Sequence, residues 1–248
     1  PICKKTDYCR VGEKVVHCTR VESDRPGKTV GWYHKLDSAA QLPPRETCKR
    51  PPRKTDKELD ARFRPMVERW QRVRLPDELS ELGNILGVSV ASLQRLGVGW
   101  SGTAWTIPER SSEGLIVGIS TRDRGGNKMM VTGSRRGLVY SNGCLVTSYG
   151  PVLIVEGMSD TAAAMTLGLP AIGRPSNCTG GSMLAELLRG WRGQIVVMGE
   201  NDRREPKPIP GFPHRDYCNG CQRCWPGAYG AEVVTKVLRR ALSGRSVF

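Results

Sequence analysis

Several features are missing from this 248-residue sequence, and each absence excludes a class of protein. No window approaches about 18 consecutive apolar residues, so a membrane-spanning helix is excluded and no membrane partner is expected. No signal-peptide pattern opens the chain. The motif G-x-x-x-x-G-K-[ST] is also absent, so the sequence holds no P-loop ATPase domain and any helicase lies elsewhere. The chain begins with Pro1 rather than Met, which indicates a trimmed chain or a fragment.

Acidic residues are scarce relative to basic ones. The chain has 38 Lys and Arg residues against 24 Asp and Glu residues, a net charge of +14. Residues 1–75 alone hold 19 basic and 10 acidic side chains. Such an excess favours a polyanionic partner, most often nucleic acid. Charge that serves only solubility is the alternative.

The nine cysteines are an odd number and occur at short spacings. Both features fit metal ligation better than the disulfide framework of a secreted protein. We therefore expect a reducing compartment and a cytoplasmic location.

The first 150 residues divide into three parts by composition. Residues 1–37 are rich in Cys and short of large apolar side chains, so this small ribbon needs a metal or a partner to hold it. Residues 38–58 form a basic, Pro-rich linker, and residues 59–150 form a mixed α+β part with basic strands. We expect helices over 56–74, 77–86 and 90–96, and strands over 15–18, 30–33, 104–108, 115–120, 129–132 and 137–140.

From residue 151 to residue 248 apolar strands alternate with helices. This alternation predicts an α/β fold with a parallel sheet, whose functional groups gather at the carboxyl ends of the strands. The stretch 203–227 looks like a Cys-rich insertion before the last helix. The expected strands cover 152–155, 171–172 and 194–198, and the expected helices cover 161–167, 183–191 and 233–242.

Acidic side chains follow two of these apolar strands. Glu156 ends the first, Glu200 and Asp202 follow the other, and Asp160 lies one turn into the helix after Glu156. If the two strands are neighbours, these carboxylates meet at one edge and repel one another unless a cation neutralises them. Hard oxygen ligands suit Mg²⁺ or Mn²⁺, which serve phosphoryl or nucleotidyl transfer. The alternative is that these acids only cap strands at the surface.

These motifs resemble those of a known family. Glu156-Gly157-x-x-Asp160 after a buried strand, with Glu-x-Asp after a later one, resembles the TOPRIM domain of bacterial-type primases, topoisomerases and some nucleases. The form EGxxD is the one that primases usually show. Upstream, the run 128–134 before Gly137-Leu138 resembles the basic subdomain of phage-type primases, and the Cys ribbon resembles their zinc-binding domain. The resemblance implies a TOPRIM parallel-sheet domain preceded by a mixed α+β basic subdomain and a small zinc ribbon.

The resemblance also implies a function. The chain would be a DnaG-like DNA primase that makes short RNA primers on single-stranded DNA from ribonucleoside triphosphates, with Mg or Mn and with Zn. Glu156 would be a metal ligand or the general base at the primer 3′-hydroxyl, and Asp160, Glu200 and Asp202 would complete the metal site. Lys128, with Arg122 or Arg124, would contact template or nucleotide phosphates.

One departure from the family pattern keeps other functions open. Glu200 stands where the family usually has Asp, which shifts the geometry of the site. A TOPRIM-type nuclease and a non-catalytic single-stranded nucleic-acid-binding module are therefore alternatives. A topoisomerase is disfavoured because 248 residues leave no room for a large gate domain. A replicative helicase on a separate chain or in a missing segment is an expected partner, and a phage or another mobile element is the expected origin.

Two groups of Cys and His residues are candidate zinc sites, because thiolates and imidazoles bind zinc tetrahedrally. Unliganded thiols are the alternative at both, and an iron–sulfur cluster is a further alternative at the second. The first group is Cys3, Cys9, His17 and Cys18, and the second, within the insertion, is His214, Cys218, Cys221 and Cys224.

Overall fold

A computed structural model describes residues 10–11, 15–26, 31–35, 54–72, 76–141, 150–202 and 225–248. They fall into two compact units, one that contains residues 10–35 and one that contains the described residues from 54 onward. The predicted zinc candidates Cys3, Cys9, His214, Cys218, Cys221 and Cys224 lie outside the described residues. Within the described part of the chain, no helix is both long enough and apolar enough to span a bilayer.

The first unit is a three-stranded antiparallel ribbon in the order β1-β2-β3. Its strands are β1 (Arg10–Val11), β2 (Val15–Cys18) and β3 (Trp32–Lys35). The strand expected at 15–18 is confirmed, whereas the one expected at 30–33 begins only at Trp32. Gly31 has a φ of 86°, a left-handed conformation that a strand cannot include, and a Cβ there would lie 2.5 Å from the Cys18 carbonyl oxygen.

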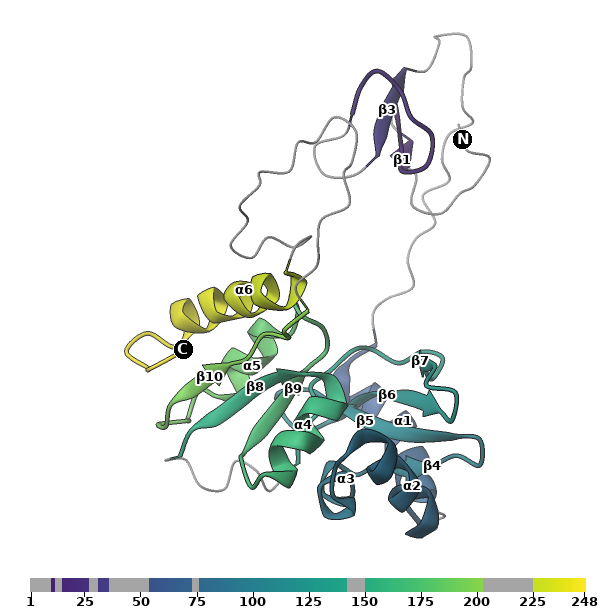
Figure 1. The fold of residues 1–248 in the computed structure, drawn as a ribbon, viewed down its shortest axis with the longest axis vertical. Helices are drawn as coiled ribbons and strands as arrows, with labels where there is room; N and C mark the ends of the chain where they lie inside the picture. The colour runs from purple at the N-terminus through teal and green to yellow at the C-terminus, as the bar shows by residue number, and fades with distance from the viewer. Residues whose placement is uncertain are drawn as a thin grey trace. The chain divides into compact units, whose positions relative to one another are not determined.

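The second unit begins with three helices and an antiparallel sheet in the order β4-β5-β6-β7 (Figure 1). Helix α1 packs against β6 through Phe63, while α2 and α3 share a core with Trp100 and Trp105. The bounds are α1 (Asp56–Arg72), α2 (Pro76–Leu86), α3 (Val90–Leu96), β4 (Gly99–Trp100), β5 (Ala104–Arg110), β6 (Ile116–Asp123) and β7 (Lys128–Met130).

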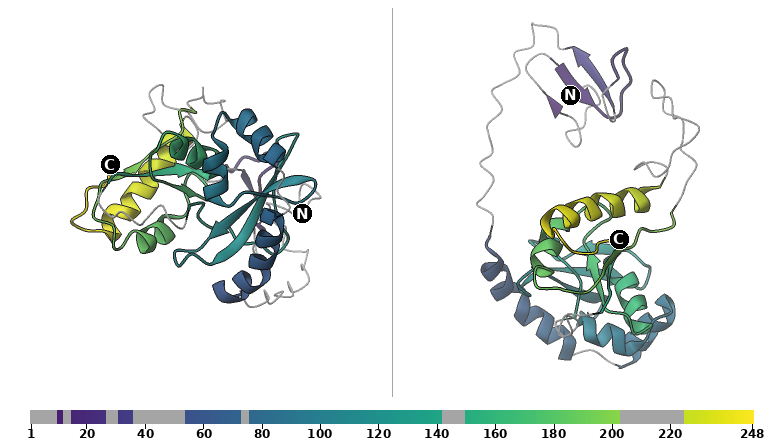
Figure 2. Two further views of the ribbon diagram at one scale, coloured as in Figure 1. Left: turned by 90° about the horizontal axis from the view of Figure 1, so that it is seen from below. Right: turned by 90° about the vertical axis from the view of Figure 1, so that its left-hand side faces the viewer.

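A parallel sheet in the order β10-β8-β9 forms the rest of this unit, as the alternating pattern predicted. Consecutive residues of β8 face opposite sides of the sheet, with Ile154 in the core of α5 and α6 and Val155 packed with α4. Figure 2 shows helices on both sides of this sheet. The fold is therefore α/β here. The bounds are β8 (Val152–Glu156), α4 (Gly157–Thr166), β9 (Ala171–Arg174), α5 (Gly181–Leu187), β10 (Ile195–Val197) and α6 (Pro226–Ala241).

Residues 138 and 139 join the two sheets of this unit through backbone hydrogen bonds. Leu138 exchanges bonds of 2.7 and 2.8 Å with Arg110 of β5, and Val139 exchanges bonds of 2.8 and 2.7 Å with Gly173 of β9. The sequence predicted one strand over 137–140, but consecutive residues here pair with different sheets, so two isolated bridges form instead. The two sheets are held edge to edge by this short segment.

Helix starts are the main errors of the sequence prediction. Helix α4 begins at Gly157 rather than 161, because Gly157, with φ 69°, turns the chain directly out of β8. Helix α6 begins at Pro226 rather than 233, within the range 203–227 assigned to the insertion. Pro is favoured in the first turn, and the Asp202 carboxylate accepts a 2.9 Å hydrogen bond from the Gly227 N–H.

Gly173 is a packing requirement that can be tested. A Cβ at this position would lie 2.4 Å from Thr161 Oγ1 and 2.5 Å from the Gly157 carbonyl oxygen. We therefore expect Gly173→Ala to push α4 off the sheet and to lower the free energy of unfolding by about 1–3 kcal/mol. Denaturant titration checks this, with Gly190→Ala as the control, because nothing lies within 4 Å of a Cβ at 190. Equal stability of the two variants would contradict the expectation.

Candidate active site

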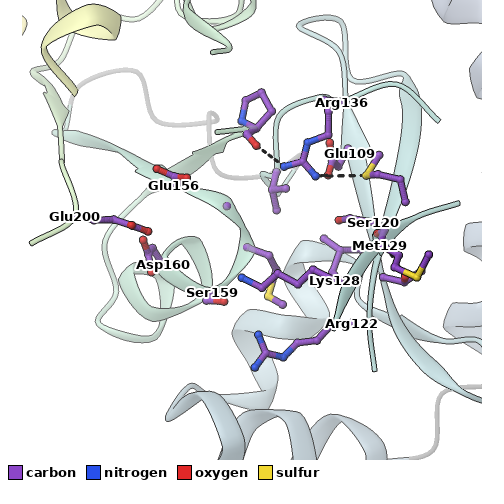
Figure 3. A pocket seen from close by; sticks show the side chains of 17 residues that line it. Glu109, Ser120, Arg122, Lys128, Met129, Arg136, Glu156, Ser159, Asp160 and Glu200 are labelled. Atoms are coloured by element: carbon purple, nitrogen blue, oxygen red, sulfur yellow. Dashed lines mark hydrogen bonds and ion pairs between the residues drawn. The ribbon is translucent and has the colours of Figure 1, made fainter. Parts of the chain in front are cut away.

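Three of the four predicted carboxylates meet at one cleft. Glu156 is the last residue of β8, Asp160 is in the first turn of α4, and Glu200 follows β10, the parallel neighbour of β8. The two acidic strands are thus neighbours in the parallel sheet, which is the condition under which the sequence places their carboxylates at one edge. All three residues line a cleft of about 490 Å³, and Figure 3 shows them together on one side of it.

Glu156 is the most constrained of the three. Its side chain is 27% exposed, and its buried Oε2 has no hydrogen-bond partner among the described residues. Arg174 forms an ion pair with this oxygen, with its Nη2 3.9 Å away. Burial raises the pKa of Glu156, and the charges of Glu200 and Asp160 raise it further, against the opposing effect of Arg174. Burial and the acidic neighbours therefore disfavour the ionised carboxylate, while Arg174 and a backbone hydrogen bond from Asn177 favour it.

Asp160 is held in a similar balance. Burial raises the pKa of Asp160, while the positive charges of Lys128 and Arg174 lower it. Lys128 reaches toward Asp160 from the opposite wall of the cleft (Figure 3). The cleft thus places carboxylates and an ammonium group within electrostatic reach of each other.

Asp202 takes a different position. Its Oδ1 accepts a hydrogen bond from the Gly227 N–H at the start of α6, and it is not among the described residues that line the cleft. The Trp225 indole N–H also donates to the Glu200 carbonyl oxygen, at 2.9 Å. The helix start and the acidic loop are therefore tied together, and Asp202 anchors this connection.

The donor set of the cleft suits a divalent cation. All three groups are carboxylates, the hard oxygen ligands of Mg²⁺ and Mn²⁺, and the buried Oε2 of Glu156 accepts no hydrogen bond from the described residues. Within the described ranges, no group of three or more Asp, Glu, His or Cys side chains is close enough to hold an ion by itself. Mg²⁺ is usually bound by one or two carboxylates together with substrate phosphates, and Glu156 and Glu200 could supply that share.

The opposite wall of the cleft is basic. Arg122 of β6 and Lys128 of β7 are cross-strand partners, and both line the cleft. Arg124 does not belong to this wall. Its guanidinium pairs with Glu81 at 2.8 Å and Glu78 at 3.6 Å and lies 4.7 Å from the Trp100 ring centre. The sequence left open whether Arg122 or Arg124 accompanies Lys128. The structure places Arg122 in the cleft.

Sequence reasoning missed three charged residues near the cleft. Buried Glu109 accepts a 2.7 Å hydrogen bond from the Gly137 N–H and pairs with Arg136 at 2.8 Å, and burial raises the pKa of Glu109. Arg136 also donates to the Pro175 carbonyl oxygen, which ties β5 to the loop after β9. Arg174 is the third. The basic pair Arg135-Arg136 was a visible signal, whereas nothing in the pattern around Arg174 marked it.

Two of the predicted zinc ligands lie in the ribbon. Cys18 is fully buried and its Sγ accepts a 3.4 Å hydrogen bond from the Val21 N–H, whereas His17 is half-buried and its ring lies 4.9 Å from that of Tyr33. The two side chains point to opposite faces of β2, as adjacent strand residues do.

Similar solved structures are primases. The primase fragment of the bacteriophage T7 primase-helicase protein has a TM-score of 0.40 and 17% identity over 66% of this chain and 62% of its own. The DnaG primase catalytic domain bound to ssDNA has a TM-score of 0.48 and 14% identity over 60% and 63%. An Aquifex aeolicus primase with zinc-binding and RNA polymerase domains has a TM-score of 0.49 and 12% identity over 79% and 55%.

This chain spans somewhat more than three fifths of the first two of these structures. No protein-family model matches the sequence, and no curated protein matches it.

The raised carboxyl pKa values predict how stability depends on pH and on metal. A raised pKa means that the folded state favours the protonated form over the ionised one. The contribution of these two carboxyls to folding stability is therefore full at pH values below the ordinary pKa values of 4.5 for Glu156 and 3.8 for Asp160. It is lost as the pH rises through the raised values. A divalent cation favours the ionised form, so we expect Mg²⁺ to raise the Tm more at about pH 7.5 than at about pH 5.

Thermal melts at both pH values check this prediction, and Glu156→Gln is the control that should reduce the Mg²⁺ effect. An equal Mg²⁺ effect at both pH values, or in both proteins, would contradict it.

Proposed function

We propose that the protein is a DNA primase that synthesises short RNA primers on single-stranded DNA by metal-dependent nucleotidyl transfer. The observation that carries the proposal is the cleft itself, in which Glu156, Asp160 and Glu200 face Lys128 and Arg122. A nucleoside triphosphate with a divalent ion needs this combination of carboxylates for the ion and cations for the phosphates. The sequence resemblance to primases supports the same reading.

The acidic and basic walls of the cleft would each serve one part of nucleotidyl transfer. Glu156 and Glu200 would hold Mg²⁺ or Mn²⁺, which supplies charge stabilisation at the attacking and leaving oxygens. Lys128 and Arg122 bind and orient the phosphates of the incoming nucleotide. The 3′-hydroxyl of the primer forms the new bond to the α-phosphorus, the bond to the β-phosphate oxygen breaks, and pyrophosphate leaves. The hydroxyl proton passes to Glu156 or to water.

The template is proposed to be single-stranded DNA. The net charge of +14 and the basic strands β6 and β7 support a polyanion along this wall. The ribbon, with Cys18 in its core and a zinc ion held by Cys18 and others of the candidate ligands, would recognise the template sequence. A replicative helicase on another chain or segment is the proposed partner.

Primer synthesis tests the proposal directly. The full chain is incubated with single-stranded DNA, labelled ribonucleotides and Mg²⁺ or Mn²⁺, beside Glu156→Gln. We expect short labelled RNA from the parent protein and a loss of on the order of 100-fold or more in the variant, which lacks a charge needed for transition-state stabilisation. Cut template would instead identify a nuclease. Intact template without product, in a protein that binds it, would identify a binding module.

Lys128 and Arg124 form a matched pair of cations for testing the basic wall. Because Lys128 faces the cleft, we expect Lys128→Ala to weaken single-stranded DNA or nucleotide binding and to reduce the salt slope of log K by about one. Arg124→Ala removes the same charge but should leave binding close to that of the parent, since Arg124 is engaged by Glu81 and Trp100. Fluorescence anisotropy at several salt concentrations checks both. Equal losses in the two variants would count against the assignment.

A further inference from the structure

A buried arginine lies beneath the carboxylates and has no role in the mechanism above. Arg174 ends β9 and is 0% exposed, which is rare for Arg because removing its charge from water is costly. Its Nε and Nη1 atoms have no hydrogen-bond partner within the described part of the chain. Hydrogen bonding alone therefore does not explain why this charge is buried here.

The contacts of Arg174 join the ends of all three parallel strands. Arg174 is the register partner of Glu156, the last residue of β8. From β9 its Nη2 donates a 3.0 Å hydrogen bond to the carbonyl oxygen of Met198, just past the end of β10. Met198 is followed two residues later by Glu200. One guanidinium thus contacts the chain at both points where the acidic residues emerge.

The charge of Arg174 interacts with the same three carboxylates that line the cleft, and it forms an ion pair with Glu156. Burial lowers the pKa of Arg174, while Glu156, Cys178, Glu200 and Asp160 act against that effect. Because the group is buried, these interactions are weakly screened by solvent and salt. Arg174 therefore acts as a fixed countercharge that is present whether or not a metal ion is bound.

We propose that Arg174 is a positioning residue that holds Glu156 and the Glu200 loop in place and lowers the affinity of the acidic cluster for divalent cations. The inference rests on the proposed function, in that this cluster is the metal site. The positive charge of Arg174 reduces the repulsion that would push the carboxylates apart when no metal ion is bound. It also competes with the metal, since each added positive charge weakens the attraction for the next.

The two effects make a combination that a purely structural arginine would not produce. Removing Arg174 should disturb the position of Glu156 and so reduce turnover. The same removal should tighten metal binding, because the cluster becomes more negative. A residue that serves packing alone would lower stability and turnover, and would leave metal affinity unchanged or weakened.

Binding of Mn²⁺, followed by the electron paramagnetic resonance signal of the free ion, tests this on the full chain. The proteins compared are the parent, Arg174→Met, Arg174→Lys and Glu156→Gln. We expect Arg174→Met to bind Mn²⁺ roughly three- to tenfold more tightly than the parent, from the loss of one unit charge nearby. Arg174→Lys keeps the charge and should bind Mn²⁺ like the parent, while its shorter reach to Met198 still lowers primer synthesis.

Arg174→Met leaves the half-buried Glu156 without its cation, so a double variant provides the test if Arg174→Met does not fold. The double variant Glu156→Gln with Arg174→Met removes both partners, which costs less than removing one. It should bind Mn²⁺ more tightly than Glu156→Gln alone, because the charge of Arg174 also acts on Glu200 and Asp160.

The outcomes separate this inference from the proposed function. Parent protein that binds no Mn²⁺ in a Glu156-dependent way would overturn the proposed metal site and the inference together. Mn²⁺ binding that depends on Glu156 but is unchanged or weaker in the folded Arg174→Met protein, or in the double variant relative to Glu156→Gln, would overturn the inference alone.

Discussion

The parallel pairing of β8 with β10 is the constraint on which the site depends. Its register, with Ile195 opposite Val152, brings the ends of the two strands to the same edge, where Glu156 and Glu200 follow. Backbone hydrogen bonds and the apolar core beneath them impose this proximity, although the carboxylates repel one another. The buried charge of Arg174 and a divalent cation are two ways of offsetting that repulsion. The pairing therefore creates both the acidic cluster and its need for positive charge.

The second wall of the cleft depends on a different set of contacts. The bridges of Leu138 and Val139 fasten the antiparallel sheet to β9, and Arg136 adds a contact from Glu109 to the Pro175 carbonyl oxygen. Helix α4 strengthens the connection, because its residues Ala162 and Met165 pack in the same core as α2 and α3. Lys128 and Arg122 consequently stand at a set position relative to the carboxylates. A site that must hold phosphates and a cation at once requires this relative placement.

Local patterns located most of the elements and the acidic residues. The apolar run 152–155 and the alternation with helices were sufficient to predict β8 and a parallel sheet, and Glu156-Gly157-x-x-Asp160 was sufficient to predict acids beside one another. The start of α6 was missed because the carboxylate that accepts a hydrogen bond from its first turn is that of Asp202, 24 residues before the helix in the chain. The role of Arg124 was also left open, because Glu81 and Trp100 approach it only in the folded chain.

Local sequence encodes which chemical groups follow the strands, because strand ends and turn glycines depend on a few neighbouring residues. Long-range contacts, in contrast, bring Glu156, Asp160 and Glu200 into one cleft, direct Asp202 to the first turn of α6, and bury Arg174 beside Glu156. Those assignments depend on strand order and on the direction of each side chain. Both are set by contacts between residues far apart in the chain, which no local pattern contains.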